Sequence, residues 1–125
     1  MTAESEQTFE ALTRVMKKHA KGLVVTAESP AVFDVKGRKA SPFPQHKGQP
    51  MWLGSVRVGK AYVSYHLTPL YMNPALAKIV SPALKKRMQG KACFNFMQEP
   101  EAELLAELSD LTLAAVKDWK TKGWV

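Results

Sequence analysis

The segment 51–67, MWLGSVRVGKAYVSYHL, constrains the fold most, because apolar and polar residues alternate on both sides of Gly59-Lys60. Alternation with a period of two is typical of a strand that buries one face, and a short glycine-containing loop between two such runs indicates a β-hairpin. With a two-residue loop at Gly59-Lys60, the predicted cross-strand pairs are Val58–Ala61, Val56–Val63 and Gly54–Tyr65.

The two faces of this hairpin differ in polarity. The predicted core face carries Trp52, Gly54, Val56, Val58, Ala61, Val63, Tyr65 and Leu67. The other face carries Met51, Leu53, Ser55, Arg57, Tyr62, Ser64 and His66. Because this second set is half polar, we expect it to form an open sheet face.

Other periodic segments flank the hairpin and complete the predicted order of elements. We predict a helix at 4–20, strands at 23–29 and 31–37, a Pro-rich loop at Arg38–Pro50, a short helix at Pro74–Ile79, a helix from Ser81 to Gly90, a strand at 91–97 and a final helix at 100–120. This order predicts a single α+β domain spanning 1–125, a two-layer sandwich. One antiparallel sheet of about five strands would be backed by the N- and C-terminal helices. The pattern leaves open whether the Arg38–Pro50 loop closes over the sheet.

Composition limits the setting in which the chain works. The single cysteine, Cys93, cannot form an intramolecular disulfide, and no secretory leader is recognisable, so we expect a cytoplasmic protein. No apolar run approaches the roughly 20 residues that span a bilayer, so we expect no membrane association. The formal net charge of +7 is concentrated in the middle of the chain. Such a basic centre attracts anionic partners, although an ordinary solvated surface explains it as well.

Two groups of residues are candidates for binding an anion or a partner. Arg57, Tyr62 and His66 share the predicted open face, where an arginine fork suits a carboxylate or phosphate. Lys85, Arg87 and Lys91 follow the helix opening at Ser81 and are available to a ligand, although they are also explained as C-terminal helix charges. The alternative for the first group is an ordinary polar sheet surface.

Cys93 is the candidate nucleophile, since Lys91 would point to the same side of a strand, which allows some lowering of the thiol pKa. Simple packing in a phenylalanine-rich strand is the competing interpretation. Single-stranded nucleic acid would stack on Trp52, Tyr62 and Tyr65, but two of these three fall on the predicted core face, so nucleic acid is not favoured. The sequence contains no phosphate-binding, dinucleotide-binding, hydrolase or metalloprotease motif, and we therefore expect no enzyme.

The segments YVSYHLTPLY (62–71) and SPALKKRMQGKACFNF (81–96) resemble the YdhG-like family of small bacterial domains. Members of that family are grouped with frataxin-like iron chaperones. The resemblance implies an α+β fold, weak iron binding by carboxylates, and delivery of iron to an iron–sulfur or haem assembly protein. Glu6 and Glu10, one helical turn apart, and Asp34 are the residues that would hold the metal.

These observations predict a non-enzymatic binding domain that presents its open sheet face to a partner. An intracellular frataxin-like iron chaperone is the specific form of this hypothesis. The alternative is a basic anion- or nucleic-acid-binding module. A third class, an enzyme that uses Cys93 or His66, predicts rapid alkylation of the thiol at neutral pH.

Overall fold

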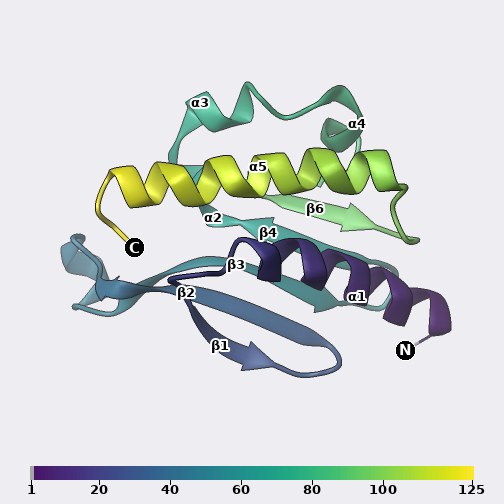
Figure 1. Cartoon of the computed structure of the whole chain (residues 1–125), viewed down its shortest axis with the longest axis horizontal. Helices are drawn as coiled ribbons and strands as arrows, with labels where there is room; N and C mark the ends of the chain where they lie inside the picture. The colour runs from purple at the N-terminus through teal and green to yellow at the C-terminus, as the bar shows by residue number, and fades with distance from the viewer. Residues whose placement is uncertain (1) are drawn as a thin grey trace.

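A computed structural model describes residues 2–125. The elements are α1 (Ala3–Lys18), β1 (Val24–Glu28), β2 (Val32–Ala40), the 3-10 helix η1 (Pro44–His46), β3 (Pro50–Val58), β4 (Val63–Leu67), α2 (Thr68–Met72), α3 (Pro74–Ala77), α4 (Pro82–Lys85), β5 (Met88–Gln89), β6 (Cys93–Phe96) and α5 (Ala102–Thr121). The strands form one antiparallel sheet in the order β1-β2-β3-β4-β6-β5. The predicted α+β fold with one antiparallel sheet and two terminal helices is confirmed (Figure 1).

The sheet has six strands, where about five were expected. The additional strand is β5, which lies inside the segment predicted to be helical up to Gly90. That helix, α4, ends at Lys85, and the two residues of β5 pair with Phe94 and Cys93 of β6. The helix prediction was therefore wrong beyond its first turn. Met88 and Gln89 satisfy their backbone hydrogen-bonding groups by pairing with β6 and do not need a helix to do so.

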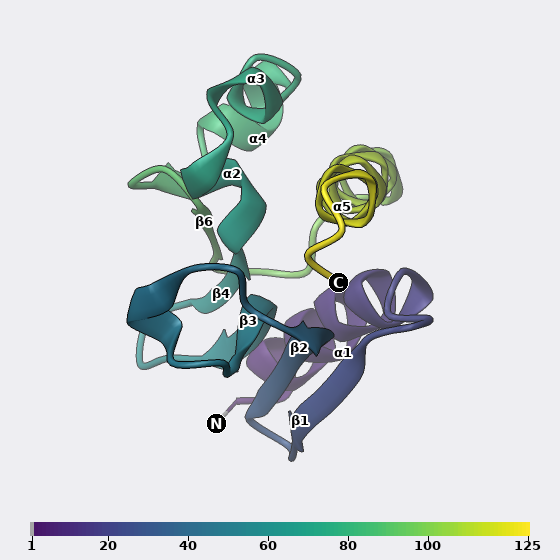
Figure 2. The ribbon, with the colours of Figure 1, turned by 90° about the vertical axis from the view of Figure 1, so that its left-hand side faces the viewer.

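Both long helices cover the same face of the sheet. In Figure 1 α1 and α5 run across the front of the strands, and in Figure 2, turned by 90°, both lie on one side of the curved sheet. Their apolar stripes pack on alternate residues of the central strands. The side chains buried most completely include Leu12, Met16, Phe33, Tyr65, Phe94, Phe96, Leu108 and Trp119. The opposite face of the sheet carries the polar residues.

The β3–β4 hairpin keeps its predicted faces in 54–58 and 63–67 but changes its register. Val56 lies opposite Tyr65 and Gly54 opposite Leu67, a shift of two residues, so the loop is four residues long (59–62). A two-residue loop of the favoured type needs positive φ at both positions, which is unfavourable for Lys60. Gly54 lies where the backbones of β3 and β4 come close together. A Cβ at this position would collide with the carbonyl oxygen of His66.

A β-bulge in β3 reverses the facing of the residues that precede it. Val35 of β2 lies opposite Gly54, whereas the next residue, Lys36, lies opposite Trp52, so Leu53 is an extra residue in β3. Such an insertion rotates the rest of the strand by one position. Leu53 and Met51 are consequently buried, and Trp52 lies on the open side. The prediction that Trp52 is a core residue, with Met51 and Leu53 on the open face, was wrong.

The Pro-rich loop is shorter than predicted, because β2 extends to Ala40 and β3 already begins at Pro50. Backbone contacts close it at both ends, with the Ser41 N–H donating to the Gln49 carbonyl at 3.1 Å. Within residues 2–125, no helix is both long and apolar enough to cross a membrane.

Candidate functional site

A row of polar side chains crosses the centre of the open face. Asp34, Ser55, His66 and Cys93 are direct cross-strand partners on β2, β3, β4 and β6, and Arg57 lies opposite Ser64 in the next row. Ser55, in the middle of this row, is only 2% exposed. This face, with Trp52 and Lys36 at one end, is called the open face below.

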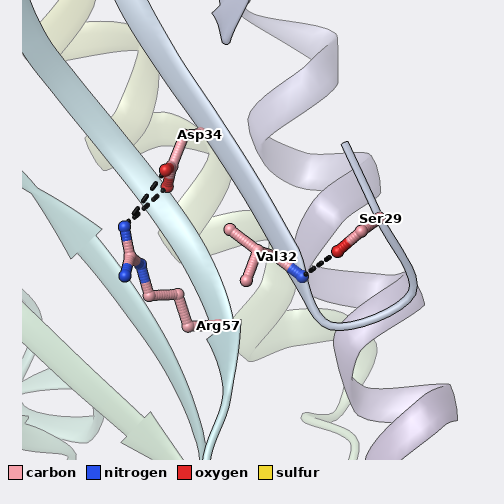
Figure 3. A network of polar contacts seen from close by, with 4 residues as sticks. All are labelled: Ser29, Val32, Asp34 and Arg57. Carbon is pink, nitrogen blue, oxygen red and sulfur yellow. Dashed lines mark hydrogen bonds and ion pairs between the residues drawn. The ribbon is translucent and has the colours of Figure 1, made fainter. Parts of the chain in front are cut away.

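Arg57 is held by a carboxylate on the neighbouring strand. Its Nη2 donates to the two carboxylate oxygens of Asp34 at 3.0 and 3.4 Å (Figure 3). The guanidinium carbon also lies 5.9 Å from the centre of the Trp52 ring. The turn that leads into β2 is closed by Ser29, whose Oγ accepts from the Val32 N–H at 3.1 Å, as Figure 3 also shows. Asp34 therefore neutralises the cation that the sequence offered for anion binding.

His66 stacks on Trp52, with ring centroids 4.5 Å apart and an interplanar angle of 4°. Burial, together with the nearby charge of Arg57, lowers the pKa of His66 below its ordinary value of 6.5. The ring is therefore mainly uncharged at neutral pH.

Tyr62 lies in the β3–β4 loop and its hydroxyl donates to Gln89 at 3.5 Å. The three predicted residues therefore do not offer free positive charge to a ligand. Arg57 is paired with Asp34, His66 is mainly uncharged, and the Tyr62 hydroxyl contacts Gln89.

The second group of predicted site residues is spread over the surface. Lys85 is the exposed last residue of α4. Arg87 lines a depression shared with the glutamates at the start of α5. Lys91 lies with its Nζ 5.7 Å from the ring centre of Tyr71, an α2 residue that is 67% exposed. Of the three cations, Lys91 alone contacts a residue that borders the cavity described below.

Cys93 is half-buried on the open face, with Sγ 3.7 Å from Oδ1 of Asn95. Burial raises the pKa of its thiol, and a hydrogen bond from Ser64 opposes this only in part. The expected lowering of the pKa by Lys91 was wrong, because Lys91 turns toward Tyr71 and desolvation dominates at the sulfur. A raised pKa disfavours the thiolate that a nucleophile requires.

The three carboxylates proposed for iron do not come together. Glu6 and Glu10 are exposed on α1, which packs against the core face of the sheet, whereas Asp34 lies on the open face and pairs with Arg57. Among residues 2–125, no cluster of three or more His, Cys, Asp or Glu side chains is arranged to hold a metal ion. Glu6, Glu10 and Asp34 therefore do not fit one metal site in this fold.

A cavity of about 510 Å³ lies where the open face meets the Pro-rich loop and α2. Its volume is within the range of roughly 300–1,000 Å³ that is typical of small-molecule sites. We call it the loop cavity, and its lining consists of Lys36, Phe43, Gln45, His46, Gln49, Pro50, Met51, Trp52, Thr68, Tyr71 and Met72. Most of these side chains are apolar or aromatic, and the charged residue among them is a lysine.

Two side chains of this lining contain a buried polar atom that is not hydrogen-bonded. Nε1 of Trp52 and Oγ1 of Thr68 have no partner within residues 2–125. Thr68 directly follows Leu67, the cross-strand partner of Gly54, so the hairpin brings it beside the bulge that turns Trp52 outward. His46 is fixed by a hydrogen bond of 2.6 Å between its Nδ1 and the Ser41 hydroxyl, which leaves Nε2 for another partner.

The loop is positioned by the C-terminal segment of the described chain. The Phe43 ring packs edge-on against Trp124 at 5.2 Å and against His46 at 5.7 Å, and Trp124 in turn packs on Trp119 of the core at 6.1 Å. The turn after η1 places Lys47 in the left-handed region with φ of 52°. The loop is thus folded against the end of the sheet, which answers the question that its sequence left open.

Sequence reasoning missed this cavity for two reasons. The bulge reverses the facing of Trp52, and the prolines of the loop indicate only a break in regular structure. The sequence signal for the cavity is the pair Phe43 and His46 in a loop restrained by prolines, since binding residues are often found on loops.

Comparisons with known proteins found no match to this chain among family models, curated proteins or solved structures. The resemblance to the YdhG-like family therefore stays a prediction.

Proposed function

We propose that the chain is a non-enzymatic binding domain that takes a small organic anion at the open face, in the loop cavity. The observation that carries this proposal is the cavity itself. It is formed by three separate parts of the fold, and it combines apolar walls with a lysine. Two of its lining side chains, Trp52 and Thr68, each contain a buried polar atom without a hydrogen-bond partner. Pockets with this combination of apolar surface and a few converging polar groups are typical of small-molecule sites.

The charge of the lining supports an anion. Lys36 lies opposite Trp52 in the sheet, and the lining contains no aspartate or glutamate. Lys91 adds a second positive charge beside Tyr71 at the border of the cavity. The patch of Arg57, Tyr62 and His66 supports an anion less well, because Asp34 already pairs with Arg57.

Binding rather than catalysis is supported by the state of the reactive groups. The pKa of the Cys93 thiol is raised, which disfavours the thiolate that a nucleophile requires. The ring of His66 is stacked on Trp52 on the open face, outside the lining of the cavity. Nucleic acid is the weaker alternative. Trp52 does lie on the open side, but one face of its ring is stacked on His66 and Arg57 lies near the ring as well, which limits its use by a base.

The proposal is tested by titrating the protein with benzoate and measuring the heat of binding by isothermal titration calorimetry. Lys36→Gln should weaken benzoate binding by about 3- to 5-fold, the range expected for one partly exposed charge pair. Lys60→Gln is the matched control, because it removes the same charge in the β3–β4 loop, outside the lining of the cavity. Equal weakening in both variants contradicts a site at the cavity. Tight, salt-sensitive binding of a short oligothymidylate instead of benzoate favours the nucleic-acid alternative.

Iron delivery, which the family resemblance implies, remains a separate prediction. An anaerobic Fe(II) titration of the labelled protein tests it by the broadening of amide signals. Broadening at Glu6 and Glu10 would support a metal on α1, and an unchanged spectrum would count against it.

A further inference from the structure

We propose that the natural ligand of the loop cavity is a carboxylate attached to an apolar, ring-sized body, and that its oxygens accept hydrogen bonds from Trp52 Nε1 and Thr68 Oγ1. This inference rests on the proposed function and specifies its ligand. The proposed function relies on the positive charge of the lining, and this inference adds a hydrogen-bond partner for each of the two unpaired donors.

The unpaired donors of the cavity lining are costly to the protein on their own. A buried N–H or O–H without a partner destabilises the folded state, and buried polar groups are usually hydrogen-bonded. Trp52 and Thr68 both line the loop cavity, and both leave one such atom unpaired within residues 2–125. A ligand oxygen that reaches them recovers this cost, which favours an acceptor as the polar end of the ligand.

The Trp52 side chain is held in place before a ligand arrives. Its ring is stacked on His66 at 4.5 Å, and Arg57 lies 5.9 Å from it. A donor that is fixed in advance loses little conformational entropy when it binds, which raises its contribution to affinity. The network of Asp34, Arg57, His66 and Trp52 therefore acts on the cavity, although most of its members lie outside it.

The lining favours an acceptor that carries a negative charge. Trp52 Nε1 is only a donor, and Lys36, its cross-strand neighbour, carries a positive charge. A carboxylate offers two acceptor oxygens and a negative charge, so it can use both the donors and the lysine. A neutral alcohol lacks the charge, and an ammonium group lacks the acceptor.

The walls define the other end of the ligand. Phe43, Pro50, Met51 and Met72 provide apolar surface, and a volume of about 510 Å³ accommodates a body the size of a phenyl ring with a short linker. The two polar atoms are shielded from solvent by neighbouring groups. Met51 and Met72 in this lining are unbranched and adopt other rotamers at low cost, so the lining can rearrange around a bound ligand.

The test uses nitrogen-15-labelled protein and three probes, which are 3-phenylpropionate, the neutral 3-phenylpropan-1-ol and acetate. We expect 3-phenylpropionate to bind at least roughly 10-fold more tightly than the other two, because each of them lacks one half of the ligand. The indole N–H signal of Trp52 should shift with 3-phenylpropionate. The indole N–H of Trp119, also buried and unpaired but outside the cavity lining, is the internal control and should not move.

Two variants separate the hydrogen bonds from the charge. Trp52→Phe keeps an aromatic ring without the donor, and Thr68→Val keeps the shape of the side chain without the hydroxyl. Each should weaken 3-phenylpropionate by about 10-fold and 3-phenylpropan-1-ol by much less. An unchanged Trp119 indole signal shows that each variant is still folded.

The outcomes distinguish this inference from the proposed function. If 3-phenylpropionate shifts the amides of Lys36 and Gln49 but neither variant weakens it, the cavity binds anions and the assigned donors are wrong. Acetate or 3-phenylpropan-1-ol binding as tightly as 3-phenylpropionate also overturns the ligand class. If no cavity signal responds to any of the three probes, the ligand class and the proposed function both fail.

Discussion

The buried hydroxyl pair that joins β4 to α5 leads to a prediction in which a second mutation restores stability. The Tyr65 hydroxyl lies 2.7 Å from Oγ1 of Thr112, and Thr112 donates to the Leu108 carbonyl at 2.8 Å. Since Thr112 has one hydrogen and gives it to Leu108, Tyr65 is the donor in the pair. Both side chains are completely buried, and burial raises the pKa of Tyr65, so this hydroxyl stays protonated.

The three variants of this pair differ in which polar atom they leave without a partner. Tyr65→Phe removes the donor, while Thr112 keeps its bond to Leu108, so we expect a loss of about 1 kcal/mol. Thr112→Val is nearly isosteric but leaves the buried Tyr65 O–H without an acceptor, so we expect a larger loss of about 2 kcal/mol. The double variant leaves no hydroxyl unpaired and should lose only about 1 kcal/mol. Adding Tyr65→Phe to Thr112→Val should therefore stabilise the protein.

Urea unfolding of the four proteins, followed by circular dichroism, measures these free energies as a double-mutant cycle. Tyr62→Phe is the control for removing a tyrosine hydroxyl, because Tyr62 is exposed and its contact to Gln89 is 3.5 Å long. It should change the stability by less than about 0.5 kcal/mol. The reasoning is refuted if Tyr65→Phe destabilises the Thr112→Val protein further, since the orphaned hydroxyl would then not be the source of the loss.

Three further predictions concern the open face and the loop. Because burial and Arg57 lower the pKa of His66 below 6.5, the unfolded chain binds its proton at a higher pH than the folded chain, and stability should fall as the pH drops below about 6.5. His66→Gln should reduce the change in urea midpoint between about pH 7.5 and pH 5.5, and an unchanged difference would contradict this assignment. Since burial raises the pKa of Cys93, iodoacetamide should alkylate it more slowly at neutral pH than in the urea-unfolded chain, and equal rates would show an exposed thiolate. Lys47→Gly should stabilise the protein by roughly 0.5–1 kcal/mol, because the φ of 52° is unfavourable for lysine. A lower melting temperature for that variant would show that the turn is held by other contacts.

Local patterns were sufficient for most of the secondary structure. The spacing of apolar residues in α1 and α5, and the alternation in 54–58 and 63–67, depend only on which side of each element is buried. This is why Arg57 and His66 could be placed on one face although the register of the hairpin was two residues off. A shift of two leaves every side chain on its original face.

The register and the bulge depend on partners that are distant in the sequence. Leu53 is an extra residue only with respect to β2, so the pattern of β3 by itself gives no sign that Trp52 turns outward. In the same way, β5 is a strand because β6 is available to pair with it. Asp34 is separated from Glu6 and Glu10 by the sheet that lies between them. The spacing of these three carboxylates in the sequence gives no sign of this separation.

The α+β class, the two terminal helices and the polarity of the open face therefore follow from the order of residues, because each is a periodic property of a short segment. The loop cavity depends on tertiary packing. It requires the bulge that exposes Trp52, the hairpin that brings Thr68 beside it, and Trp124, which holds Phe43 and the loop against the end of the sheet. These contacts join residues up to 81 positions apart in the case of Phe43 and Trp124 (124 − 43), and side chains that far apart become neighbours only when the whole chain has packed.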